Sequence, residues 1–221
     1  MDAKPTEELT QLCQPFTFWF TYFKKSKDKQ LEEFEDNLKP ISTFESAEEF
    51  WGIYQHMKRP DALPRGCEFF LFKKGIKPLW EDPANAGGGR FFLSMKKSGV
   101  TNKVWEDLQI AMLMLGPDDF NGVNGVVLNV RTSEVIMSIW TKALSEEQKN
   151  DARTWLKEAL DLPNEQIITY KVHPTDEQLV KKQEELVKEE EDRKKKLQDM
   201  EQREAERRAK EQEALQEQQN Q

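Results

Sequence analysis

Residues 38–57 read LKPISTFESAEEFWGIYQHM, and they join a strand-like segment directly to a helix-like one. The segment 38–44 is short, has a β-branched and aromatic character, and is typical of a strand. Ser46 and Glu49 have the spacing of a capping box, in which each side chain accepts a hydrogen bond from the other residue's backbone N–H. Apolar residues then recur at the i, i+3, i+4, i+7 spacing of one helix face, at Phe50, Ile53, Tyr54 and Met57. The stretch therefore predicts a strand followed by a capped helix that packs on a sheet.

The same pattern of strands and helices repeats along the chain. Strands are predicted at 16–23, 38–44, 67–72, 90–96, 125–131, 135–141 and 166–172. Helices are predicted at 48–57, 102–113 and 146–162, with their starts marked by Ser46, Thr101 and Ser145. The short connections between paired strands favour antiparallel pairing. We therefore expect an α+β fold, with one antiparallel sheet, three helices on one face and, if the sheet is strongly twisted, a concave open face.

The distribution of aromatic residues indicates where the globular part ends. The chain has 221 residues and six Trp, but no aromatic residue follows Tyr170. This predicts a flexible N-terminal arm at 1–14, a globular domain at 15–175 and a charged helical extension at 176–221. In the extension, acid-to-base pairs at i,i+4 such as Glu184 and Lys188 each contribute about 0.2–0.5 kcal/mol to an isolated helix.

The extension lacks a continuous heptad seam. Leu179 and Leu186 are seven residues apart, but charged residues such as Arg193 and Glu204 interrupt the apolar positions. A solvated single long helix is the first interpretation, and weak self-association through this helix is the alternative.

Composition excludes several classes of function. The two cysteines, Cys13 and Cys67, form no CxxC motif, and His56 and His173 are too few for a zinc site, so we expect no metal and a reducing compartment. The sequence has no run of 18 apolar residues and no apolar leader, so we expect a cytoplasmic protein without a membrane span. The net charge of −8 argues against binding of long nucleic acid along its phosphates, although a short nucleotide in a pocket remains possible.

Residues 75–92, GIKPLWEDPANAGGGRFF, form the loop with the most distinctive chemistry. It has neither the spacing of a phosphate-binding glycine loop nor a helix after it. Glu81 and Asp82 are adjacent, would diverge, and have no His or Ser partner motif, which argues against an enzyme.

Recognition of a flat ring is the better interpretation of this loop. Trp80 can stack on a base, and the Glu81 carboxylate can accept two hydrogen bonds from an edge such as N1–H and N2–H of guanine. A cationic base would gain further from cation–π stacking and the carboxylate. For an isolated Trp-Glu-Asp tripeptide, the alternative of a buried Trp beside a solvated Glu would be preferred.

Trp51 lies about 100° away from the apolar stripe of its predicted helix, in line with Ala47. An exposed Trp on the helical side is a candidate contact surface. Packing of its ring on the edge of a neighbouring helix is the alternative, and helix geometry alone favours neither.

These motifs occur together, in order, in one known family. Through FTFWF, NLKPISTFESAEEFWGIYQHM, CEFFLFKKGIKPLWED, GGGRFF, WEDLQIAML, NGVVLNVR and SIWT, the chain from Phe16 to His173 resembles the messenger-RNA cap-binding translation initiation factor 4E family. The resemblance implies a curved antiparallel sheet of about eight strands with three helices on its convex face. It also implies that the concave face binds 7-methylguanosine, whose methylated guanine is a cationic ring.

The resemblance assigns roles to individual residues. Trp80 and Phe34 would stack on the cap base, Glu81 would bind its N1 and N2 edge, and Trp140 would lie near the methyl group. Arg90 and Arg131 would contact the cap phosphates. Ala47, Trp51, Trp105 and Asp107 would bind partner proteins, which in this family dock a short helix carrying Tyr, four residues, Leu and a further apolar residue.

Departures from the family pattern modify these expectations. Phe34 and Phe16 stand in place of Trp, which resembles the family's second class, including homologues that often repress translation. Ile136 occupies the position of a phosphate-binding Lys, so we expect weaker triphosphate binding. Glu106 stands where the main factor has Leu, which changes the docking surface for scaffold proteins.

The sequence thus predicts a non-enzymatic, cytoplasmic protein that binds capped messenger RNA and acts in translation initiation or its regulation through initiation scaffold or repressor proteins. One alternative is a repressor that occupies the cap without recruiting the scaffold. The other is an interaction protein that acts mainly through its C-terminal helix.

Overall fold

A computed structural model describes residues 9–22, 34–115, 122–174, 178, 188, 192–196 and 198–200. The chain divides into two compact units, Met1–His173 and Pro174–Gln221. The described residues of the second unit after Pro174 are all helical, namely 178, 188, 192–196 and 198–200. The rest of the helix predicted at 176–221 lies outside the described residues.

The first unit contains a single antiparallel sheet, as predicted. Its strands are β1 (Gln11–Tyr22), β2 (Lys39–Ser46), β3 (Cys67–Lys73), β4 (Gly89–Lys96), β5 (Val123–Val130), β6 (Glu134–Thr141) and β7 (Thr169–Val172). Their order across the sheet is β2-β1-β3-β5-β6-β4-β7. About eight strands were expected, and the described part of the chain contains seven.

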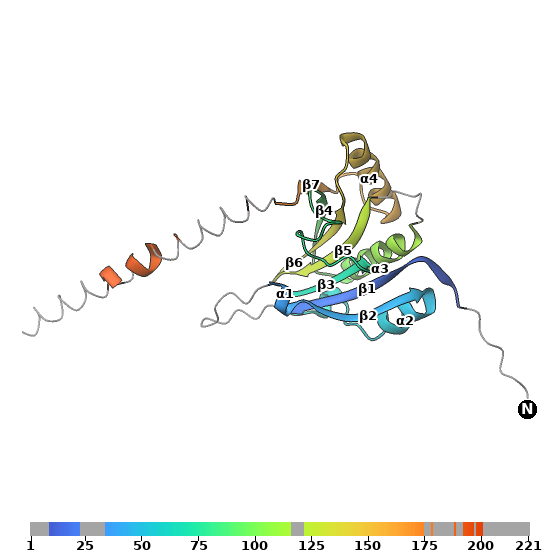
Figure 1. Cartoon of the computed structure of the whole chain (residues 1–221), viewed down its shortest axis with the longest axis horizontal. Coiled ribbons are helices and arrows are strands. Elements are labelled where there is room, and N and C mark those ends of the chain that lie inside the picture. The colour runs from blue at the N-terminus through green and yellow to red at the C-terminus, as the bar shows by residue number, and fades with distance from the viewer. Residues whose placement is uncertain are drawn as a thin grey trace, which may run out of the picture. The chain divides into compact units, whose positions relative to one another are not determined.

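The three predicted helices are present and lie along the same side of the sheet (Figure 1). They are α2 (Ala47–Tyr54), α3 (Gly99–Met114) and α4 (Glu146–Ala159). Two short elements were not predicted, namely α1 (Phe34–Asn37) and the 3₁₀ turn η1 (Pro60–Ala62).

Several element boundaries differ from the sequence-based expectation, and two of these differences involve positions singled out above. Helix α3 begins at Gly99, so Thr101 lies inside its first turn, where its Oγ1 donates to the carbonyl of Lys96 at 2.6 Å. Strand β1 begins at Gln11, inside the predicted arm, because Gln11 pairs with Ser46 of β2. The capping box at α2 is confirmed: Ser46 Oγ accepts from the N–H of Glu49 at 3.2 Å, and Glu49 Oε2 accepts from the N–H of Ser46 at 3.3 Å.

Alternation along the strands separates two faces. The helix-covered face carries the main core, which includes Phe16, Phe18, Leu71, Phe91 and Leu128 from the strands and Phe50, Trp105 and Leu156 from the helices. The opposite face, here called the open face, carries a smaller apolar cluster that we call the aromatic floor. Its buried members are Leu38, Phe70, Phe72, Val127 and Trp140, with Trp19, Ile76, Leu79 and Trp80 packed against them.

A glycine makes the aromatic floor possible. A Cβ at Gly125 would lie 2.3 Å from the ring of Phe72, which is far closer than two carbon atoms can approach. The bare backbone of β5 therefore allows the Phe72 ring to lie directly on it. The edge of that ring contacts Trp140, with the centroids 5.6 Å apart, so Gly125 indirectly supports the position of Trp140.

Candidate functional site

The loop between β3 and β4 presents Trp80 and Glu81 at the open face. Trp80 is half-buried against the aromatic floor, whereas Glu81 is exposed. The next residue, Asp82, folds the loop back on itself: its carboxylate accepts from the N–H of Lys77 at 2.8 Å and from the N–H of Ala84 at 2.9 Å. The two residues predicted to recognise a base thus lie inside a closed turn rather than on a free tip.

A buried asparagine anchors the same loop to the sheet. Asn85 is fully buried, and its Nδ2 donates to the carbonyl oxygens of Lys77 at 2.9 Å and Leu79 at 2.7 Å. Its Oδ1 accepts from Nδ2 of Asn124 on β5 at 2.9 Å. These bonds hold the backbone just before Trp80, because a buried amide that loses such partners costs the full desolvation of its polar atoms.

The segment of Phe34 is joined to this loop. Phe34 is the first residue of α1, and Glu35 Oε1 of the same helix accepts from Nζ of Lys77 at 2.7 Å. Leu38, just after α1, belongs to the aromatic floor together with Trp80. The backbone of the second stacking candidate thus lies close to the loop of the first, and the orientation of the Phe34 ring stays a prediction.

Trp140 lies on β6 in the aromatic floor, 5% exposed, with the ring of His173 at a centroid distance of 4.3 Å. Burial, and then the charge of Arg90, lower the pKa of His173 to about 4, so its ring is neutral at neutral pH. Within the described residues, Trp140 Nε1 and both ring nitrogens of His173 have no hydrogen-bond partner. Buried polar atoms without partners are rare, and three of those in the described residues lie together here.

The carboxyl group of Glu68 lies in the electrostatic field of both Arg90 and Arg131. Arg90 on β4 lies over the rings of Phe92, at 4.7 Å, and Trp140, at 5.6 Å. Glu68 on β3 accepts a hydrogen bond from Asn129 and lies in the field of both arginines.

Burial dominates at Glu68 and raises its pKa to about 7, although the charges of Arg131 and Arg90 act in the opposite direction. The same burial lowers the pKa of Arg90, which Glu68 partly offsets. The structure therefore brings the two predicted phosphate-binding arginines to one region of the open face. Ile136 lies in the same row of the sheet, opposite Asn129.

The predicted partner surface lies on the helical side. Phe50 and Tyr54 are buried, and Trp51 between them is 44% exposed, with its ring against both of theirs at 5.0 and 5.7 Å. Ala47 is half-buried at the start of the same helix. Arg59 donates to the Tyr54 hydroxyl and forms an ion pair with Glu106 of α3 at 2.7 Å.

Trp105 requires a correction. Its side chain is only 2% exposed and belongs to the main core, so its ring is unavailable to a partner and supports α3 from beneath. Asp107 is half-buried, pairs with Lys103, and lines a groove of about 620 Å³ between α3 and α4. The apolar part of that groove includes Ile110, Met114 and Ala159.

Several residues that lie around the site were not predicted from the sequence. They are Glu68, Phe92, Asn85 and Asn124. Strand alternation could have placed Glu68 beside Phe70, and Phe92 beside Arg90, on the same face. The buried amides of Asn85 and Asn124 leave no such signal, because the bonds between them join distant segments.

The described residues contain neither a candidate metal cluster nor a membrane-spanning helix. No group of three or more His, Cys, Asp or Glu side chains in these residues could hold a metal ion. None of the described helices is long and apolar enough to cross a membrane.

Comparisons with known proteins agree with this fold and show the family of the chain. The family model of eukaryotic initiation factor 4E matches residues 11–188, and the chain belongs to this family. The translation initiation factor NCBP of Oryza sativa is 39% identical over 163 residues, covering 73% of this chain and 70% of that protein. Initiation factor 4E of Candida albicans is 38% identical over 160 residues, covering 70% and 77%. Membership of this family of translation initiation factors confirms the prediction of a non-enzymatic protein.

Solved structures show the same relationship. The structure of Ascaris suum eIF4E-3 in complex with the m2,2,7G cap has a TM-score of 0.68 and 30% sequence identity, covering 76% of this chain and 93% of that one. The complex of Caenorhabditis elegans eIF4E-3 with the 4E-binding protein Mextli and a cap analog has a TM-score of 0.67 and 31% identity, covering 75% and 94%.

Proposed function

We propose that this protein binds the 7-methylguanosine cap of messenger RNA on its open face and acts in the cytoplasm in translation initiation or its regulation. The base stacks between Trp80 and the Phe34 ring, with Glu81 at its N1 and N2 edge and Trp140 near the methyl group. Arg90 and Arg131 neutralise the phosphates.

The observation that carries this proposal is the anchored Trp80–Glu81 loop beside the aromatic floor. Asn85 and Asp82 fix the backbone on both sides of these two residues before any ligand arrives. A fixed loop backbone and a half-buried aromatic ring reduce the entropy that binding would otherwise lose. Such pre-organisation is expected of a binding site and serves no evident purpose in a plain connection between strands.

The chemistry of the loop favours a methylated base over a plain one. Methylation at N7 gives guanine a positive charge, which is attracted both to the face of an indole ring and to a carboxylate. Glu81 is exposed in this structure and would become desolvated against the base, where a charge-assisted hydrogen bond is strongest. Support also comes from the Ascaris suum relative, whose structures contain an m7G and an m2,2,7G cap.

Intrinsic tryptophan fluorescence during titration with 7-methyl-GTP, with GTP as the comparison ligand, tests the proposal. We expect quenching by the methylated ligand and at least about tenfold weaker binding by Glu81→Ala, because the cationic base then lacks its counter-charge. Glu165→Ala, which removes an exposed carboxylate far along the sequence, is the matched control. Equal quenching by both ligands, or wild-type affinity in Glu81→Ala, would contradict the assignment.

For the helical side we propose a docking surface for partner helices that carry Tyr, four residues, Leu and an apolar residue. Ile110 and the exposed Trp51 are apolar parts of this surface, and Asp107 lines the same groove as Ile110. The proposal is supported by the Caenorhabditis elegans relative, whose structure contains the 4E-binding protein Mextli.

A second candidate function, repression by occupying the cap without recruiting the scaffold, is favoured by the Arg59–Glu106 ion pair. This pair places charge on the docking surface, because Glu106 stands where the main factor of the family has Leu. Binding of scaffold and repressor peptides should be compared on wild-type protein and on Glu106→Leu. Repression predicts that the scaffold peptide binds weakly to wild type and gains at least about fivefold in the variant, through added apolar contact. Equal, strong binding of both peptides to wild type would exclude it.

A further inference from the structure

Lys171 was not part of the predicted site, yet the sheet places it beside Arg90. In the pairing of β7 with β4, Lys171 is directly opposite Arg90. Tyr170, its neighbour along the strand, packs against the main core, so alternation directs Lys171 to the open face.

The two cations share one aromatic ring. The Arg90 guanidinium lies 4.7 Å from the centroid of Phe92, and the Lys171 ammonium lies 5.5 Å from the same centroid. Two like charges held over one ring repel each other, and the ring compensates only part of that repulsion. Within the described residues no carboxylate forms an ion pair with Lys171. Such an arrangement is favourable when an anion lies between the two cations.

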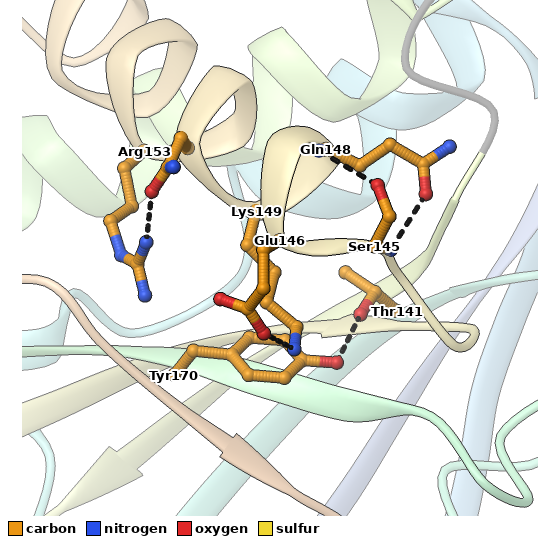
Figure 2. Close-up of polar contacts among 8 residues, drawn as sticks. Thr141, Ser145, Glu146, Gln148, Lys149, Arg153 and Tyr170 are labelled. Atoms are coloured by element: carbon orange, nitrogen blue, oxygen red, sulfur yellow. Dashed lines mark hydrogen bonds and ion pairs between the residues drawn. The ribbon is translucent and has the colours of Figure 1, made fainter.

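Lys149 shows how the same fold treats a lysine that has only a structural role. Its ammonium lies 4.8 Å from the centroid of Tyr170, on the helix-covered side of the same strand, and it also pairs with Glu146 at 2.6 Å (Figure 2). An aromatic contact and a carboxylate together neutralise this lysine. In the part of the chain that the structure describes, Lys171 has the aromatic contact but no carboxylate partner.

We propose that Lys171 and Arg90, both close to the ring of Phe92, form an anion site that binds a phosphate group of the capped RNA. The proposal rests on the cap-binding function proposed above and names a further residue of that site. Lys171 supplies a positive charge on the open face from β7, whereas Ile136 of β6 supplies none there. The phosphate can come from the cap triphosphate or from the first nucleotides of the RNA.

Titrations of Lys171→Gln with three ligands test the site: 7-methylguanosine, 7-methyl-GTP and a capped trinucleotide. We expect unchanged affinity for the nucleoside and about two- to fivefold weaker binding of at least one phosphate-bearing ligand, the range for an exposed charge pair. The slope of log K against log salt should fall by about one contact. A loss for 7-methyl-GTP places the phosphate in the cap, and a loss for the trinucleotide alone places it in the RNA.

Lys149→Gln is the matched control, since it removes the same charge from the opposite side of β7. Equal losses of affinity in the two variants would mean that the effect comes from the net charge of the protein, and would overturn the proposal. Unchanged affinities in Lys171→Gln would overturn it as well, while leaving cap binding intact. Failure of the wild-type chain to bind all three ligands would overturn cap binding, and this site with it.

Discussion

The two faces of the sheet bury similar aromatic side chains but differ in how completely their polar atoms are paired. In the described residues, the buried side-chain atoms without hydrogen-bond partners are Trp19 Nε1, Thr21 Oγ1, Gln109 Oε1, Trp140 Nε1 and both ring nitrogens of His173. Gln109 lies on α3, and the others lie on or beside the open face. Within the described residues, the buried polar atoms without partners are therefore concentrated on or beside the open face.

Cations over aromatic rings show the same difference. On the helical side, Arg59 lies over Tyr54 and pairs with Glu106, and Lys149 lies over Tyr170 and pairs with Glu146. On the open face, Arg90 lies over Phe92 beside a carboxyl group whose pKa is raised to about 7. Arg59 and Lys149 thus each have a carboxylate partner, whereas Arg90 forms no ion pair within the described residues, as expected where an anionic ligand binds. Arg153, which lies over Phe91 at 5.8 Å, is an exception on the helical side.

The largest expected difference in stability is between replacement of Trp105, which is buried, and replacement of Trp51, which is exposed. Trp105→Ala should destabilise the fold by about 3–5 kcal/mol, because it leaves a cavity in the main core. Trp51→Ala removes a 44% exposed ring and should cost less than about 1 kcal/mol while weakening binding of a docking peptide. Urea unfolding at equilibrium measures both. Similar losses in the two variants would contradict the division between core and docking surface.

His173 should make the fold sensitive to acid. Its folded pKa of about 4 is below the ordinary 6.5, so between these values the unfolded chain binds a proton that the folded chain does not. Stability is complete above pH 6.5 and falls toward pH 4, by up to about 3 kcal/mol. His173→Phe should flatten this part of the profile of unfolding free energy against pH. An unchanged acid slope in the variant would show that His173 is not its source.

Glu68 should act in the opposite direction. Its folded pKa of about 7 is above the ordinary 4.5, so the folded chain holds a proton that the unfolded chain releases between these values. Its contribution is complete below pH 4.5 and is lost as pH rises through 7. Glu68→Gln should therefore stabilise the fold by about 2 kcal/mol at pH 8 and not at pH 4.5. Glu134→Gln, an exposed acid on the same face, is the control, and an equal gain there would sink the explanation by burial.

Asn85→Ala should affect the open face without removing any group that touches the ligand. The loop of Trp80 loses two amide hydrogen bonds, and the base loses its pre-organised site. We expect about tenfold weaker binding, or about 1–1.5 kcal/mol, for 7-methylguanosine and 7-methyl-GTP alike. Fluorescence titration measures it, with the exposed Asn164→Ala as the control. If Asn85→Ala weakened the binding of 7-methyl-GTP but not of 7-methylguanosine, the variant would affect phosphate binding, which would contradict the role of Asn85 in anchoring the Trp80 loop.

The helix-covered face could be predicted from local patterns, whereas much of the open face could not. The periodicity of α2 predicted its buried stripe, with Phe50 and Tyr54 inside and Trp51 outside, since helix spacing is a local property. The resemblance assigned Trp105 to the partner surface, but a family resemblance does not specify which way a ring points, and here the ring is buried. On α3 it follows buried Val104 and precedes buried Leu108, which is a local signal for the core.

The open face depends on which strands are neighbours. Glu68 on β3 feels the charge of Arg90 on β4 only because β5 and β6 place these strands in one sheet. Lys171 lies opposite Arg90 only because β7 adds to β4 at the edge of the sheet. Strand order and register are set by the whole core, so no short stretch of sequence carries this information. The motif of Trp80 and Glu81 could be identified because its residues are adjacent, whereas Asn85 is joined to the sheet by a hydrogen bond from the distant Asn124.

The smallest expected effect compares the capping boxes of two helices on the covered side. Ser145 Oγ accepts from the N–H of Gln148 at 3.2 Å at the start of α4 (Figure 2), and Ser46 Oγ accepts from Glu49 at the same distance at the start of α2. Ser145→Ala and Ser46→Ala should each cost about 1 kcal/mol in urea unfolding. Since α2 also carries Trp51, Ser46→Ala alone should weaken binding of a docking peptide, by about twofold through fraying of its first turn. If both variants weakened the peptide equally, docking would extend over α4, and the covered face would have to be divided differently.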